Sequence, residues 1–156
     1  LRNQLYLVRN FYLDLLRPLT ATNPGTKRIA STARYIAMMD EMVSRRFGVP
    51  FGVVILPSLQ QMDPESLRRF KMHYNLGQED LDPHRTPAAL GAALRQQGVA
   101  VLDTLPALQR SGIPGQNLHF PDDGHLTPRA HAVIGKAVAS WIATGFGKGT
   151  PIGKQK

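Results

Sequence analysis

The chain has 156 residues, of which 42% are hydrophobic and 19% are charged, and these values are typical of one folded domain. It contains no cysteine, which excludes disulfides, thiolate metal sites and a cysteine nucleophile. No apolar run approaches the roughly 18 residues that a membrane span needs. The net charge of +8 comes from basic residues that are spread along the chain, so we expect neither a transmembrane segment nor a nucleic-acid partner.

Two helices are expected before the first strand. Residues 1–17 place apolar side chains near helical spacing until Pro18 ends the run. Residues 28–47 repeat the pattern, with Met39 and Met42 on the apolar side. We expect both methionines to pack in the core rather than to form a ligand site.

Two apolar segments have the composition of strands. Residues 49–58, VPFGVVILPS, are rich in β-branched side chains and bounded by glycine and proline, which is typical of a parallel strand buried on both faces. Residues 99–103, VAVLD, form a second, shorter run of this kind. Helical patterns lie between them, and a strand–helix–strand order predicts an α/β fold with a parallel sheet.

Three helix starts are indicated by a capping residue followed directly by proline. These pairs are Asp63–Pro64, Thr86–Pro87 and Thr127–Pro128. The helix that begins at the third pair has apolar residues near helical spacing, and we expect them to face inward. They are Val133, Ile134, Ala137, Val138, Trp141 and Ile142.

The loop before that last helix contains two adjacent carboxylates and a histidine. Asp122, Asp123 and His125 lie within four residues, and loops at the ends of strands often carry catalytic side chains. An Asp carboxylate bonded to one imidazole nitrogen leaves the other nitrogen to act as a general base. The alternative is a turn in which Asp122 and Asp123 bond backbone amides and His125 is a surface residue.

A metal site is the other reading of this region. His119, His125 and His131 are spaced by six residues, with a carboxylate available as a fourth ligand. Six residues do not bring two histidines to one face of a helix, because each residue turns the helix by about 100°. We therefore expect no metal and no other cofactor.

The order of these segments resembles the SGNH hydrolase superfamily, the GDSL-like esterases and the acyltransferase-associated domains. The resemblance covers residues 47–145 and rests on VVILPSLQQMDP, TPAALGAALRQQGVAVLDTLPAL and, most strongly, FPDDGHLTPRAHAVIGKAVASWI. It implies a flavodoxin-like three-layer α/β/α domain that acts on O-acyl esters of small molecules, carbohydrates or lipids. It also implies a periplasmic or extracellular location, as in many relatives.

The same resemblance implies roles for individual residues. His125 would be the base of a Ser–His–Asp triad, and Asp123 would orient it, with Asp122 as the second match to the family pattern. His119 and His131 would be structural.

The chain departs from the family pattern in its nucleophile. It contains no Gly-Asp-Ser and none of the glycine and Gly-x-Asn-Asp blocks that supply oxyanion donors. We therefore expect residues 1–145 to be the C-terminal part of one domain that is incomplete at its N-terminus and inactive alone, and residues 146–156 to be a flexible basic tail.

Two alternatives to that expectation remain open. Ser58 follows an expected strand, but no Gly-x-Ser-x-Gly surrounds it, so we expect it to form a cap or turn. The chain as a whole could instead be a complete, non-catalytic SGNH-like module used for binding or scaffolding.

Overall fold

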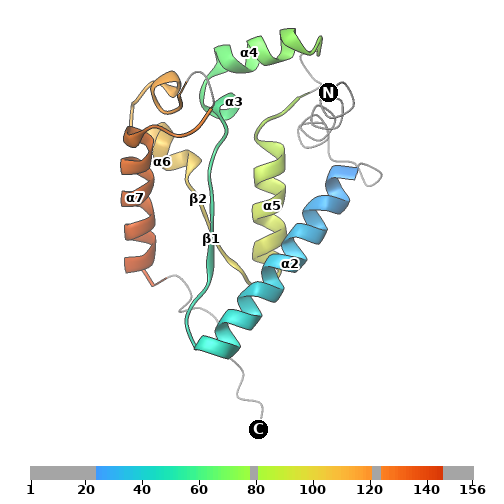
Figure 1. Ribbon diagram of the computed structural model, residues 1–156, viewed down its shortest axis with the longest axis vertical. Helices are drawn as coiled ribbons and strands as arrows, with labels where there is room; N and C mark the ends of the chain where they lie inside the picture. The colour runs from blue at the N-terminus through green and yellow to red at the C-terminus, as the bar shows by residue number, and fades with distance from the viewer. Residues whose placement is uncertain (1–23, 78–80, 121–123, 146–156) are drawn as a thin grey trace, which may run out of the picture.

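The computed structural model describes residues 24–77, 81–120 and 124–145 (Figure 1). The helix expected at 1–17, the tail expected at 146–156, and both Asp122 and Asp123 lie outside the described residues. The description below concerns the described ranges alone.

The described residues form a small parallel sheet with helices on both sides (Figure 1). The two strands pair in register from Gly52↔Ala100 to Ile55↔Asp103. Helices α2 and α5 lie on one side of the sheet in Figure 1, and α6 and α7 lie on the other. The elements in chain order are α2 (Pro24–Phe47), β1 (Gly52–Ile55), α3 (Leu59–Met62), α4 (Pro64–His73), α5 (Arg85–Gln96), β2 (Ala100–Asp103), α6 (Leu105–Arg110), a 3-10 helix (Gly115–Asn117) and α7 (Pro128–Ala143). The α/β class expected from the sequence is confirmed.

Two of the three expected helix caps are present. The Asp63 carboxylate accepts a hydrogen bond from the Ser66 amide at 3.0 Å, and Pro64 begins α4. Thr127 Oγ1 accepts one from the Ala130 amide at 3.4 Å, and the following proline begins α7. Each cap satisfies an amide that has no partner within its helix.

The third expected cap was wrong. Helix α5 begins at Arg85, so Thr86 lies inside its first turn rather than before it. The turn that precedes α5 is closed by Asp82, whose carboxylate accepts a hydrogen bond from the His84 amide at 2.9 Å. This local bond fixes the start of the helix one residue before the threonine.

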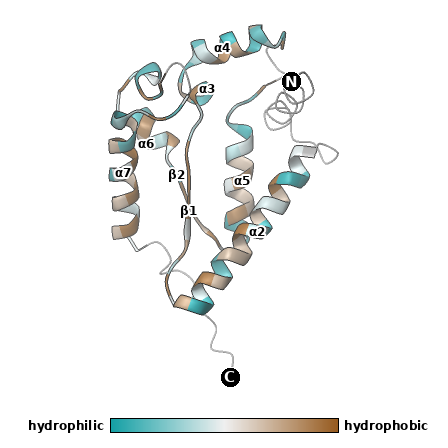
Figure 2. Cartoon of the chain, viewed as in Figure 1, coloured by the Kyte–Doolittle hydropathy of each residue, from teal (hydrophilic) through white to brown (hydrophobic). Residues whose placement is uncertain are grey.

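The helices on the two sides of the sheet contribute to two separate apolar clusters. Figure 2 shows hydrophobic residues in brown along the helices of both sides. The α2/α5 cluster is built on buried Ala33, Leu94 and Val99, with Val53 of β1 and Val101 of β2 packed against it. The α6/α7 cluster is built on buried side chains from both helices and from the loop between them. Its buried members are Leu108, Leu118, Ala130 and Ile134.

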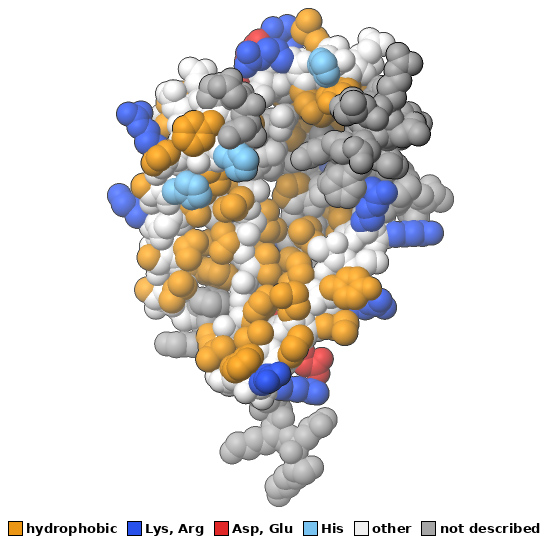
Figure 3. Space-filling model, in the orientation of Figure 1, with side chains coloured by type: hydrophobic (Ala, Val, Ile, Leu, Met, Phe, Trp, Pro, Cys, Tyr) orange, Lys and Arg blue, Asp and Glu red, His pale blue; other side chains and the backbone are white. Residues whose placement is uncertain are grey.

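Three expectations about burial were wrong. Every residue of β1 is half-buried, because the described helices do not cover the sheet completely, whereas the sequence predicted a strand buried on both faces. Figure 3 shows hydrophobic side chains gathered over the middle of the visible face, where β1 runs in Figure 1. Met39 and Met42 are 48% and 57% exposed, and Ile142 is 54% exposed, so none of them lies in the core.

Candidate active site

The carboxyl ends of the two parallel strands lie at one edge of the sheet. Thr104, which follows β2, is fully buried, and its amide and Oγ1 both donate to the Ile55 carbonyl, at 3.2 and 2.8 Å. The Asp103 carboxylate accepts a hydrogen bond from the Leu105 amide at 3.0 Å and so helps to start α6. These bonds fix the two strand ends to each other, which makes this edge a rigid support for the loops that leave it.

Ser58 lies at this edge, shortly after the end of β1 and directly before α3. It is exposed, and its amide donates to the Gln61 side chain at 2.9 Å. The expectation that Ser58 forms a cap is confirmed, since it occupies the N-cap position of α3 with an extended backbone.

His125 is held by backbone hydrogen bonds on both sides of its loop. Its carbonyl accepts from the Phe120 amide at 2.7 Å, and the Phe120 carbonyl accepts from Gly124 at 3.0 Å. Gly124 has a φ of +71°, a backbone conformation that glycine adopts without a Cβ penalty. Backbone hydrogen bonds therefore join the described ends of this loop, and the His125 side chain is exposed.

Thr127 connects this loop to α7. Its amide donates to the Leu118 carbonyl at 3.0 Å, and its hydroxyl donates to the Asn117 carbonyl at 2.9 Å. The same hydroxyl oxygen caps the helix, so one side chain links the loop to the first turn of α7. His125 is thus mounted just before the N-cap of a well-anchored helix.

The three histidines of the alternative metal site have different environments. His119 is 2% exposed, and its Nε2 lies 3.3 Å from the Pro57 carbonyl oxygen. His125 and His131 are exposed, His131 on the first turns of α7. Across residues 24–77, 81–120 and 124–145, no group of three His, Asp or Glu side chains is placed to hold a metal ion.

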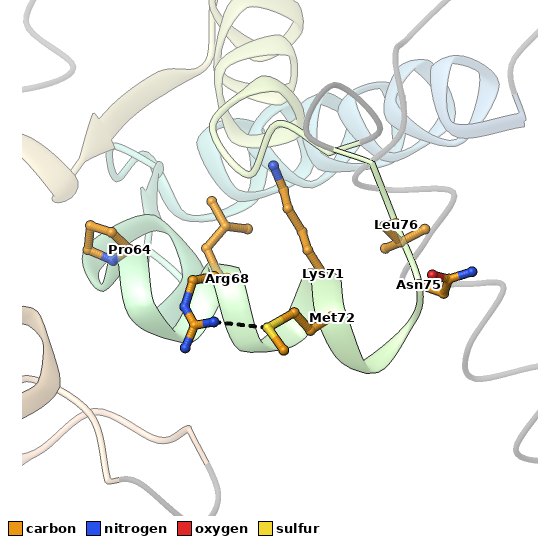
Figure 4. A pocket seen from close by; sticks show the side chains of 7 residues that line it. Pro64, Arg68, Lys71, Met72, Asn75 and Leu76 are labelled. Carbon is orange, nitrogen blue, oxygen red and sulfur yellow. Dashed lines mark hydrogen bonds between the residues drawn. The ribbon is translucent and has the colours of Figure 1, made fainter.

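Neither of two hollows on the surface of the described residues is lined by Ser58 or His125. One, of about 560 Å³, lies along α4 and is lined by Leu67, Arg68 and Met72 among others (Figure 4). The other, of about 1070 Å³, lies at the opposite end of the strands, beside Phe51, Ala100 and the C-terminal half of α2. Ser58 and His125 are exposed and line neither of these two hollows.

Charge around the α4 hollow is locally paired. The Arg68 guanidinium donates to both Glu65 carboxylate oxygens, at 2.7 and 2.6 Å, and also to Met72 Sδ at 2.9 Å. The hydrogen bonds from Arg68 lower the pKa of Glu65, and they raise the pKa of Arg68. This pair is exposed and lies outside the loop that carries His125.

The sequence did not indicate the contacts of His119 and Thr104. Both are buried polar residues whose partners, Pro57 and Ile55, lie at the end of β1. A short sequence motif carries no signal for bonds across such separations. None of the described helices has the length and hydropathy of a membrane-spanning segment.

The described residues form an α/β domain with a parallel sheet, and a comparison with protein families gives its class. A family model described as SGNH hydrolase-like domain, acetyltransferase AlgX, matches residues 16–155. The match covers most of the chain, so the chain belongs to this AlgX-type family. No curated protein and no solved structure gives a significant match.

Proposed function

We propose that this domain provides the histidine and aspartate of a Ser–His–Asp site that hydrolyses or transfers O-acyl groups. The observation that carries the proposal is His125, an exposed imidazole on a backbone-clamped loop at the N-terminus of α7. An SGNH hydrolase-like domain of the acetyltransferase AlgX type supports this chemistry, because acyl transfer needs a base to activate a hydroxyl group.

In this proposal His125 is the general base and Asp123 is its orienting carboxylate. Asp123 precedes the histidine by two residues, and Asp122 is the alternative at three. A carboxylate bound to Nδ1–H fixes the tautomer, so Nε2 is left to accept the proton of the nucleophile. The substrate class that fits is an O-acyl ester of a small molecule, carbohydrate or lipid.

The histidine tautomer tests the proposed pair without requiring turnover. Nitrogen-15 NMR of His125 is expected to show the Nδ1–H form in the unmodified chain. The Asp123→Asn variant should remove this preference, and the Asp122→Asn variant should keep it. The roles of the two carboxylates are reversed if only Asp122→Asn has the effect, and the triad is contradicted if neither variant changes the tautomer.

Ester turnover provides the second test. We expect these 156 residues to hydrolyse a generic acetyl ester no faster than buffer, because no Gly-Asp-Ser block is present in them and loss of a nucleophile removes most of the catalysis. Turnover that is lost in both Ser58→Ala and His125→Ala would make Ser58 the nucleophile. Turnover that survives His125→Ala would contradict the proposal.

The lack of a Gly-Asp-Ser block favours one second candidate, a non-catalytic SGNH-like binding or scaffold module. In such a module the Asp122–His125 loop would be an ordinary turn. The tautomer experiment separates the two candidates, because a turn gives His125 no fixed tautomer that depends on one aspartate.

A further inference from the structure

His119 is a buried imidazole with a single hydrogen-bond partner among the described residues. Its Nε2 lies 3.3 Å from the Pro57 carbonyl oxygen, whereas its Nδ1 is buried and has no partner there. A carbonyl oxygen can only accept a hydrogen bond, so Nε2 must carry the proton. His119 is therefore expected to carry a proton on Nε2 and to donate it to the Pro57 carbonyl.

The backbone around His119 is the same backbone that holds His125. His119 pairs with Leu126 in an isolated antiparallel bridge. On its two sides, the Leu118 carbonyl accepts from Thr127 and the Phe120 amide donates to His125. A movement of His119 would therefore be transmitted to both ends of the loop.

The partner of His119 lies at the sheet edge. Pro57 is buried, follows β1 and immediately precedes Ser58. The bond spans 62 positions of the sequence and joins the loop before α7 to the carboxyl end of β1. The other anchors of the loop, at Asn117 and Leu118, are local.

We propose that His119 is a positioning residue, which fixes the His125 loop to the end of β1 through its Nε2–H bond to the Pro57 carbonyl. The importance of this position rests on the proposed function, in which His125 is the base. The hydrogen bond itself does not depend on that function, and its test is independent of catalysis.

Two substitutions separate hydrogen bonding from packing. The His119→Gln variant keeps a side-chain N–H donor at a similar reach, whereas His119→Phe keeps the ring volume and removes the donor. In His119→Phe, amide hydrogen exchange at Phe120 and Thr127 is expected to accelerate about tenfold, the factor that corresponds to one typical net hydrogen bond. In His119→Gln it should stay within about threefold of the unmodified chain.

The Val99 amide, which donates to the Leu94 carbonyl in the other cluster, is the internal control and should exchange at the same rate in all three proteins. Protection kept by His119→Phe and lost by His119→Gln would overturn the proposal, because the ring would then act by packing alone. If a variant does not fold, nitrogen-15 NMR of His119 in the unmodified chain tests the proposal instead. The Nε2–H form supports the proposal and the Nδ1–H form overturns it.

These outcomes are distinct from those for the proposed function. Failure of the triad would appear as a His125 tautomer that is insensitive to both aspartates, with His119 unchanged. Failure of the positioning role would appear at His119, Phe120 and Thr127, with the His125 tautomer still dependent on an aspartate.

Discussion

The two sides of the sheet differ in how completely their helices are covered. On the α6/α7 side, Leu108, Leu118 and Ala130 are fully buried, and the loop that carries His125 is hydrogen-bonded onto this cluster. On the other side, α2 buries Ile29 and Ala33 but exposes a second apolar stripe on its far face. This stripe consists of Tyr35, Met38, Met39 and Met42, which are 48–59% exposed.

The candidate loop lies on the α6/α7 side of the sheet, whereas the exposed apolar stripe lies on α2. Residues 35, 38, 39 and 42 repeat at helical spacing, so α2 has two apolar faces, of which α5 and the sheet cover one. The described ends of the candidate loop adjoin the α6/α7 cluster and are joined to it by backbone hydrogen bonds. A side chain that must be held in one orientation requires such support.

Truncation of buried side chains tests this comparison and is expected to have the largest effect on the free energy of unfolding. Leu108→Ala and Leu94→Ala should each lower the free energy of unfolding by roughly 2–5 kcal/mol, because both side chains are fully buried. Met39→Ala should change it by no more than about 0.5 kcal/mol, since the side chain is half exposed. Urea denaturation measures all three, and a Met39→Ala cost equal to that of Leu108→Ala would show that the α2 stripe is covered.

Substitutions of Gly115 and Gly135, on the α6/α7 side, are expected to have the next largest effects on stability, with opposite signs. A Cβ at Gly115 would lie 2.6 Å from the Met62 carbonyl carbon and collide with its oxygen, both backbone atoms that cannot turn away. Gly115→Ala should therefore cost about 1–3 kcal/mol or more. Gly135→Ala in α7, where a Cβ meets nothing within 4 Å, should gain about 0.5–1 kcal/mol.

Thermal unfolding of the two glycine variants measures both changes in stability. If Gly115→Ala raises the melting temperature, Gly115 does not lie against the Met62 carbonyl. The Gly135 variant serves as the control for the general effect of adding a methyl group.

The smallest effect is expected at the Glu65–Arg68 pair, which is exposed and outside both clusters. Arg68 lowers the folded-state pKa of Glu65. The Glu65 carboxylate therefore contributes to stability above its unfolded-state pKa, and this contribution is lost as the pH falls through its folded-state pKa. The stability difference between the unmodified chain and Arg68→Gln should therefore be small at pH 7, smaller still in high salt, and absent at strongly acidic pH. Arg69→Gln is the matched control, because the Arg69 Nε lies 3.9 Å from the Glu65 carboxylate. An Arg68→Gln effect that is equal at pH 7 and at acidic pH would contradict a stabilising Glu65–Arg68 pair.

The sequence predicted the parts of the fold that depend on local signals. Both strands, α4 with its Asp63 cap and α7 with its Thr127 cap were found, because β-branched runs and cap–proline pairs act within a few residues. Helices α3 and α6 were not anticipated, since 4 and 6 residues are too short to show a helical period.

Burial and distant contacts could not be predicted in this way. Helical spacing identified an apolar side of α2, but it carries no information on whether another element covers Met39 or Met42. The candidate loop was located from its Asp–His spacing, whereas the His119–Pro57 bond depends on how the chain returns to the sheet after 62 positions. The roles of Asp122, Asp123 and His125 stay predictions.

The exposed stripe on α2 also has a consequence for the behaviour of the chain in solution. A contiguous apolar surface favours association, while a net charge of +8 keeps copies of the chain apart through mutual repulsion. Added salt shortens the range of that repulsion to about 3 Å at 1 M without weakening apolar contacts. We therefore expect a higher ionic strength to favour association of copies of the chain.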